Sequence, residues 1–192
     1  MHLEQLRARA KSEGTRFPKK ALLLIDLTES AERKLIYSYG TVSKGLEKVA
    51  ALTAYAAHLR LPIFAANSQD MRFPHLDELT CPLITSVAGE SVVTVRKTDY
   101  SIFNRGATIN DKSISFEQIL YDLGISQLIM AGSDVEETIR DTPITIRALT
   151  SEEILFRSSL KDDDGKIKKT LELFREANRY CGTLMGLFEQ MV

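Results

Sequence analysis

The stretch that decides the fold is "IMAGSDVEETIRDT", residues 129–142. It begins with the end of an apolar strand, passes through an Ala-Gly turn and continues into polar residues that can begin a helix. The first N–H groups of such a helix have no partner within it and can bind an oxyanion. Because Ser, Asp and Thr are also common at ordinary helix starts, the junction predicts a strand-to-helix turn and leaves its chemistry open.

Strands and helices alternate on the N-terminal side of this junction. Residues 21–27, "ALLLIDL", form an apolar run broken only by Asp26, which is typical of a strand covered on both faces. Residues 42–59 carry apolar side chains at helical spacing, and residues 62–66, "PIFAA", follow as a second strand. The pattern predicts a strand-helix-strand unit.

The alternation continues toward the C-terminus. Residues 91–95, "SVVTV", predict a strand, residues 115–124 predict a helix closed by Gly124, and residues 126–132, "SQLIMAG", predict another strand. Residues 152–156, "EEILF", are interpreted as a fifth strand. Alternating strands and helices indicate parallel pairing with right-handed crossovers. We therefore expect an α/β fold, a three-layer α/β/α sandwich with a mainly parallel sheet.

Both ends of the chain carry apolar stripes. Residues 161–166, "KDDDGK", predict a solvated turn. The stripe that follows it has helical spacing and consists of Leu173, Ala177, Tyr180, Cys181, Leu184, Leu187, Phe188 and Met191. The simplest interpretation is a helix packed on the sheet, and the alternative is a subunit interface. Leu3, Leu6 and Ala10 form a weaker stripe of the same kind.

Composition limits the classes of function. The chain has 192 residues, of which 44% are hydrophobic, and this length predicts a single domain over residues 1–192. Its net charge of −1 lacks the excess of positive charge that a nucleic-acid-binding protein carries. The N-terminus has no apolar run of signal-peptide length, and no segment approaches the roughly 18 apolar residues that span a bilayer. We expect a soluble, cytoplasmic protein that binds neither nucleic acid nor membrane.

Cysteine usage argues against a disulfide framework or a zinc site. The two cysteines, Cys81 and Cys181, lie far apart and outside any metal-ligand spacing. Buried, unreactive thiols are the ordinary interpretation. We expect no metal and no cofactor.

Two ionisable residues follow apolar strands. Ligands of open α/β sheets bind beyond the carboxyl ends of the strands. Asp26 stands at such an end, and a carboxylate held against apolar walls is suited to proton transfer, although Asp is also a common turn residue. Lys97 follows the predicted strand at residues 91–95. Its ammonium would keep Asp26 ionised or stabilise a developing negative charge. The alternative for Lys97 is a solvated surface side chain.

Three stretches, taken in order, resemble the isochorismatase-like, or cysteine hydrolase, superfamily. Residues 22–28, "LLLIDLT", are similar to its first strand, which ends in a catalytic Asp. Residues 95–103, "VRKTDYSIF", are similar to its Lys-x-x-x-Ser-x-Phe motif. Residues 124–142 are similar to its strand, Ala-Gly turn and nucleophile-bearing helix. The resemblance covers roughly residues 20–150.

The resemblance assigns roles to individual residues. It implies that Asp26 is the acid/base and Lys97 its charge partner. It places the oxyanion-binding turn at Ser133 and Asp134 and implies that the peptide joining them is the family's cis bond. The position of the family's nucleophilic Cys, six residues after the Gly of the turn, falls at Thr138.

The chain departs from the family's pattern in several places. An aliphatic hydroxyl at Thr138 is a far weaker nucleophile than a thiol, so amidase chemistry through a thioester is not available there. Pro143 would break a helix at a deep position, and a helix that begins near Thr142 would accommodate it but displace the oxyanion-binding amides. Thr28 replaces an amide residue, and residues 67–75, "NSQDMRFPH", lack the Asp-and-His metal pattern of the nicotinamidase branch.

Two classes of function are compatible with these residues. The first is an enzyme without a covalent nucleophile, because the branch of the family that hydrolyses the enol ether of isochorismate has a small residue at the Cys position and protonates its substrate from the Asp. The second is a catalytically silent member that acts as a binding or structural protein, since a fold supplies no function without its site. The expected partners are a small-molecule ligand and, because superfamily members commonly assemble as oligomers, further copies of the chain.

Overall fold

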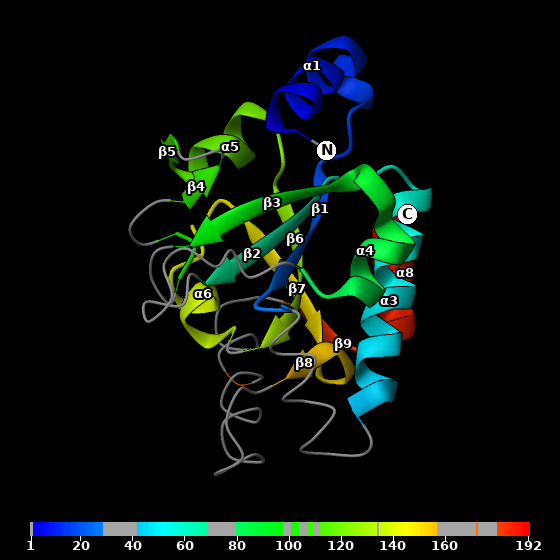
Figure 1. Ribbon diagram of the computed structural model, residues 1–192. Helices are drawn as coiled ribbons and strands as arrows, with labels where there is room; N and C mark the ends of the chain where they lie inside the picture. The colour runs from blue at the N-terminus through cyan, green and yellow to red at the C-terminus, as the bar shows by residue number, and fades with distance from the viewer. Residues whose placement is uncertain are drawn as a thin grey trace.

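One sheet organises the part of the chain that the structure describes. The computed structural model describes residues 2–28, 42–68, 80–97, 101–103, 107–109, 112–133, 135–156, 172 and 180–192. The strand order in the sheet is β5-β4-β3-β2-β1-β6-β7-β9, and β8 pairs with β6 (Figure 1). The strands at the two edges of the sheet are short, and the long strands lie at its centre.

The centre of the sheet is parallel throughout. Its five strands pair side by side in the order β3-β2-β1-β6-β7. They are β1 (Lys20–Ile25), β2 (Ile63–Ser68), β3 (Val92–Lys97), β6 (Gln127–Ser133) and β7 (Arg147–Ser151). The flanking strands are β4 (Ala107–Ile109), β5 (Lys112–Ile114), β8 (Leu155–Phe156) and β9 (Tyr180–Gly182). Among the described strand pairs only β3–β4 and β4–β5 are antiparallel, so the predicted mainly parallel sheet is confirmed.

Helices cover both faces of the sheet. One face carries α1 (Leu3–Glu13), α5 (Phe116–Asp122) and α6 (Glu136–Arg140), and the other carries α3 (Val42–His58), α4 (Pro82–Ala88) and α8 (Leu184–Met191) (Figure 1). Strand β1 is buried on both sides because Leu23 packs toward the first group of helices and Leu24 toward the second. This is the three-layer α/β/α sandwich that the alternating pattern predicted.

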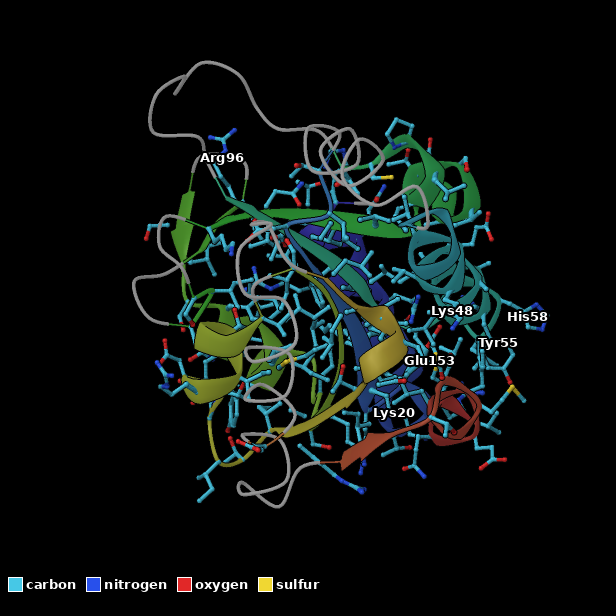
Figure 2. The ribbon with its side chains drawn as sticks, turned by 90° about the horizontal axis from the view of Figure 1, so that it is seen from below. Lys20, Lys48, Tyr55, His58, Arg96 and Glu153 are labelled. Carbon is cyan, nitrogen blue, oxygen red and sulfur yellow. The ribbon has the colours of Figure 1, made fainter. Side chains whose placement is uncertain are left out.

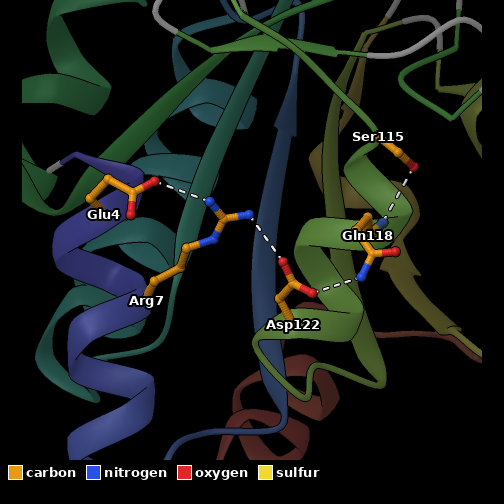
Figure 3. A network of polar contacts seen from close by, with 5 residues as sticks. All are labelled: Glu4, Arg7, Ser115, Gln118 and Asp122. Atoms are coloured by element: carbon orange, nitrogen blue, oxygen red, sulfur yellow. Dashed lines mark hydrogen bonds and ion pairs between the residues drawn. The ribbon is translucent and has the colours of Figure 1, made fainter.

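Polar contacts fix α1 against α5. Ser115 caps α5 by accepting a hydrogen bond from the N–H of Gln118. Arg7 of α1 lies between Glu4 and Asp122, with 3.0 Å between its nitrogens and a carboxylate oxygen on either side (Figure 3). Leu3 and Leu6 are buried in the same hydrophobic cluster as Phe116 of α5, so the weak N-terminal stripe does mark a packed helix.

The fifth parallel strand lies a few residues earlier than the sequence pattern suggested. It is β7, Arg147–Ser151, whereas Glu152–Ile154 forms a 3-10 turn, η3, and only Leu155–Phe156 pairs with β6 as a strand. The apolar pattern missed β7 because the strand is short and contains Thr150, a polar residue that is fully buried. The Thr150 hydroxyl donates to the carbonyl of Met130, 2.8 Å away, which allows a polar side chain inside the sheet.

The C-terminal stripe is not one continuous helix. Tyr180–Gly182 form β9, which pairs parallel with β7, and the helix occupies only Leu184–Met191. Backbone pairing at the sheet edge overrides the helical spacing of the side chains there. Leu187 and Met191 are buried in the core, as expected for a helix packed on the sheet. The predicted turn at 161–166 and the first part of the stripe lie outside the described residues. None of the described helices is long and apolar enough to cross a membrane.

Candidate functional site

The register of the sheet brings the predicted site residues to one edge. Ile25, the last residue of β1, pairs with Ala66 of β2 on one side and with Gly132 of β6 on the other. Lys97 ends β3 and pairs with Ser68 at the end of β2. Since these strands are parallel, their carboxyl ends lie at the same edge, where an open α/β sheet binds its ligands.

Asp26 and Lys97 meet at this edge. The Nζ atom of Lys97 is in direct contact with Oδ2 of Asp26 and forms an ion pair with it. The side chain of Lys97 is only 2% exposed, whereas that of Asp26 is 20% exposed. An ammonium so far removed from water requires a charged or hydrogen-bonding partner. The solvated-lysine alternative is therefore wrong, and the carboxylate is the member of the pair that solvent or a ligand can reach.

The backbone of Asp26 has an unusual conformation. Its φ angle is +51°, and it shares a positive φ with only one other non-glycine residue of the described part of the chain, Arg60. The N–H of Asp26 donates to the carbonyl of Ala66 at 2.9 Å, and its own carbonyl accepts a hydrogen bond from Oγ of Ser133 at 3.4 Å. Both peptide groups of this turn residue are thus attached to the neighbouring strands.

Gly132 allows the two central strands to approach closely. Its φ is +129°, and a Cβ atom built on it would lie 2.0 Å from the carbonyl oxygen of Ile25 and 2.8 Å from the carbonyl carbon. No side chain fits in that space, so the Gly of the Ala-Gly turn is required by the backbone of β1. The turn therefore places Ser133 beside the residue that follows Ile25, which is Asp26.

Thr138 does not join the ion pair through a hydrogen bond. It lies on α6 and is fully buried, and within the described part of the chain its hydroxyl has no hydrogen-bond partner. Its carbonyl accepts a hydrogen bond from Oγ1 of Thr142 at 2.7 Å. A buried hydroxyl without a partner is uncommon and destabilising, so Thr138 requires an explanation that packing alone does not give.

Pro143 terminates the helix and does not begin it. Helix α6 spans Glu136–Arg140, and Pro143 follows in the loop before β7. The expectation of a helix that begins near Thr142 is therefore wrong. Proline disfavours a helical conformation in the residue before it, so the chain leaves the helix before this point. Asp134 lies outside the described residues, and the oxyanion-binding turn and cis bond at Ser133 and Asp134 stay predictions.

Sequence reasoning missed a buried polar group beside Asp26. Asn67, near the end of β2, is 4% exposed, and its Nδ2 donates to Oγ1 of Thr80 at 3.2 Å. Thr80 also pairs through its backbone with Thr28, which is buried as well. A polar residue that closes the apolar run "PIFAAN" is the same signal that identified Asp26, and it could have identified Asn67.

The serine of the Lys-x-x-x-Ser-x-Phe motif has a local structural role. Ser101 is buried, and its Oγ accepts a hydrogen bond from the N–H of Phe103 at 3.2 Å. The ring of Phe103 packs on that of Phe116, with 5.5 Å between the ring centroids. This part of the motif shapes the turn at residues 101–103 and packs it against α5.

No group of three His, Cys, Asp or Glu side chains that could hold a metal ion occurs within the described ranges. Residues 69–75 of the segment compared with the nicotinamidase metal site lie outside those ranges, so the absence of a metal stays a prediction. Cys81 is a buried thiol and forms no disulfide. The side chain of Cys181 is not among those described.

Comparisons with known proteins identify the fold. No family model matches the chain, and no curated protein matches it. Solved structures do match. The MAR1 ribonuclease from Caenorhabditis elegans has a TM-score of 0.67 at 16% identity over 90% of this chain and 81% of its own. An isochorismatase family protein from Burkholderia thailandensis has a TM-score of 0.65 at 15% identity over 88% of this chain and 93% of its own.

A third similar structure is the YcaC gene product from Escherichia coli, which is described as an octameric hydrolase of unknown specificity. Its TM-score is 0.62 at 16% identity, over 88% of this chain and 77% of its own. Identities of this size establish a shared fold and leave activity open. The chain therefore has the fold of isochorismatase family proteins.

Proposed function

We propose that the protein hydrolyses the enol ether of a small anionic molecule, with Asp26 as proton donor and no covalent intermediate. The observation that carries this proposal is the buried contact between Lys97 and Asp26 at the carboxyl edge of the sheet. It combines a group that can transfer a proton with a cation that can bind an anionic substrate.

The energetics of the pair support a functional role over a structural one. Burying an ammonium carries a large desolvation penalty, and apolar residues of similar volume would often give equal or greater stability. A fold that needed Lys97 only for packing would gain little from keeping it charged. An ion pair with one buried and one accessible member is better suited to a binding site, because the accessible carboxylate can exchange partners.

Substrate binding provides the change that makes Asp26 an acid. An ammonium in contact favours the ionised form of a carboxyl group. When an anionic group of the substrate binds Lys97, the ammonium divides its interaction between that group and Asp26. The proposal therefore requires a substrate that carries a negative charge near its ether oxygen.

The chemical steps follow from this arrangement. Asp26 donates its proton to the terminal vinyl carbon, which leaves an oxocarbenium ion at the ether carbon. Water adds to that carbon, and the proton it loses returns to the Asp26 carboxylate. The resulting hemiketal passes its hydroxyl proton to the leaving oxygen and separates into a keto acid and an alcohol. No step requires a nucleophilic side chain, in agreement with a hydroxyl at Thr138 that bonds no base within the described structure.

The test is hydrolysis of isochorismate, followed by the release of pyruvate. The native protein should release pyruvate, and Asp26→Asn should lose nearly all of this activity because an amide cannot donate the proton. Asp122→Asn is the matched control, since Asp122 on α5 pairs with Arg7 of α1 and this change should leave the activity intact. Turnover by Asp26→Asn at the native rate would remove Asp26 from the mechanism.

A catalytically silent binding protein is the second candidate, and the full burial of Thr138 favours it. In that case the position equivalent to the family's nucleophile is closed, and the ion pair serves only to bind an anion. Calorimetry distinguishes the two functions: a silent protein binds isochorismate with a measurable heat and releases no pyruvate. Lys97→Met should abolish that binding under either function.

Self-association is a further part of the proposal. The similar hydrolase from Escherichia coli is described as octameric, and Met185 on α8 exposes 67% of its surface. A subunit contact on α8 would bury this apolar side chain. Light scattering of the native protein and of Met185→Glu should give a larger mass for the native chain. A monomeric mass for the native chain would contradict the proposal.

A further inference from the structure

The left-handed backbone of Asp26 requires an explanation. Positive φ angles are uncommon for residues other than glycine, although Asp tolerates them better than most. Such a conformation persists only where the surrounding structure determines it, and it concentrates at functional sites. In the proposed function Asp26 is the proton donor, so whatever holds its backbone also determines where its carboxylate points.

Two hydrogen bonds of the Asp26 backbone help to hold this conformation. Its N–H donates to Ala66 of β2 at 2.9 Å, which is an ordinary continuation of the sheet. Its carbonyl is different, because the donor there is a side chain, the hydroxyl of Ser133 on β6, at 3.4 Å. This distance is long for a hydrogen bond between two oxygens, so its contribution to global stability is small. Its effect is on the direction of one peptide group.

Ser133 is itself held in place on two sides. Gly132, directly before it, lies so close to Ile25 that a Cβ atom would come within 2.0 Å of the Ile25 carbonyl oxygen. On the other side β8 pairs with β6, with Phe156 opposite Ser133. Ser133 is 3% exposed, so little water competes for its hydroxyl. A donor fixed in this way can fix its acceptor.

We infer that Ser133 is a positioning residue for Asp26: its hydroxyl holds the left-handed turn that directs the carboxylate to Lys97. The inference rests on the proposed function for its catalytic consequence, whereas its structural part concerns only Ser133 and Asp26. It gives the serine of the turn a role separate from the oxyanion binding that the family resemblance implies.

The experiment replaces the hydroxyl and reads the conformation of Asp26 directly. In Ser133→Ala the backbone of Asp26 should leave the positive-φ region, as read from a crystal structure or from the Cα–Hα coupling of Asp26 in NMR spectra. Ser133→Thr, which keeps a hydroxyl, should restore the native φ. Ser86→Ala is the control, because Ser86 also donates to a carbonyl, that of Leu83 at 2.8 Å, but lies on the surface of α4.

Kinetic measurements separate a positioning role of Ser133 from a purely stabilising role. With isochorismate as substrate, Ser133→Ala should lower kcat by about 10- to 100-fold with a smaller change in KM, because a misdirected acid impairs the chemical step more than binding. Ser133→Thr should recover most of kcat. If Ser133→Ala fails to fold, Ser133→Cys, which has nearly the same size and a weaker donor, provides the same readings.

The outcomes distinguish this inference from the proposed function. If native protein releases no pyruvate, the proposed function fails, and the conformation of Asp26 in Ser133→Ala still decides the role of Ser133. If Ser133→Ala keeps a positive φ at Asp26 and its contact with Lys97, the inference is overturned whatever the activity. If Ser133→Ala lowers the melting temperature but leaves the conformation of Asp26 unchanged, the inference is also overturned, because Ser133 then has only a structural role.

Discussion

Two lysine-carboxylate pairs in this molecule have the same chemistry and very different surroundings. Lys97 and Asp26 meet at the carboxyl edge of the sheet, where the lysine is 2% exposed. Lys48 and Glu153 meet at the surface between α3 and α8, where the side chains are 41% and 39% exposed (Figure 2). Because water and salt screen the second pair more than the first, the two pairs should respond differently to substitution, salt and pH.

The exposed pair connects secondary-structure elements, whereas we propose that the buried pair serves a binding site. One carboxylate oxygen of Glu153 lies 2.5 Å from Nζ of Lys48 on α3, and the other accepts the N–H of Leu184 at the start of α8 at 3.1 Å. Glu153, which lies in η3, thus links α3 to α8. These structural contacts account for the pair without a bound ligand. The buried pair joins the ends of β1 and β3, and a buried salt bridge is a poor way to gain stability.

The largest expected effect is the loss of one member of the buried pair. Asp26→Ala leaves the Lys97 ammonium buried without its carboxylate, and we expect the free energy of unfolding to fall by about 3–5 kcal/mol. Adding Lys97→Met in the same chain removes the buried ammonium as well and should recover most of that loss. Urea denaturation of the three chains measures both changes. A double variant as unstable as Asp26→Ala would contradict a penalty that arises from the buried charge of Lys97.

The next effect compares two threonines that are both fully buried. The hydroxyl of Thr138 has no partner in the described structure, whereas that of Thr150 donates to Met130. Thr138→Val should therefore leave stability unchanged or raise it, and Thr150→Val should lower it by about 1 kcal/mol.

Thermal denaturation of the two variants measures these changes in stability. Each variant is the control for the other, because both replace a threonine hydroxyl by a methyl group of similar size. Equal losses in both would show that the Thr138 hydroxyl has a partner after all. A stable Thr138→Val chain that no longer binds isochorismate would assign the hydroxyl to the ligand.

The sequence predicted the buried pair because both of its members follow apolar strands. The rule that parallel strands place their carboxyl ends at one edge was enough to bring Asp26 and Lys97 together. The same rule did not reveal the role of Ser133, because that role depends on a positive φ at Asp26 and on the close approach of Ile25 and Gly132. Neither feature leaves a periodic pattern in the chain.

The misplaced elements have a similar cause. Tyr180–Gly182 carry side chains at helical spacing but form a strand, since the edge of β7 offers backbone partners that the pattern of side chains does not record. The position of Thr138 could be counted from the turn glycine, but its burial depends on how α6 packs. Local pattern therefore predicted which residues lie near the site, and tertiary packing determined how each is used.

The smallest expected effect concerns the exposed pair and its dependence on pH. The hydrogen bond from Lys48, assisted by the N–H of Leu184, lowers the pKa of Glu153 below its ordinary value of 4.5. A carboxyl group with a lowered pKa in the folded state contributes stability above its unfolded pKa and loses it as the pH falls through the folded value. Because both side chains are more than a third exposed, we expect Glu153→Gln to reduce the free energy of unfolding at pH 7 by less than about 1 kcal/mol.

This difference between Glu153→Gln and the native chain should shrink as the pH falls below about 4.5, the unfolded value. It should also shrink in about 1 M NaCl, in which the Debye length is about 3 Å, whereas the penalty of Asp26→Ala should change little. Urea denaturation at two pH values and two salt concentrations provides both comparisons. If salt reduced the two penalties equally, the carboxyl-edge pair would be as solvated as the surface pair, and the argument that its burial reflects a binding site would fail.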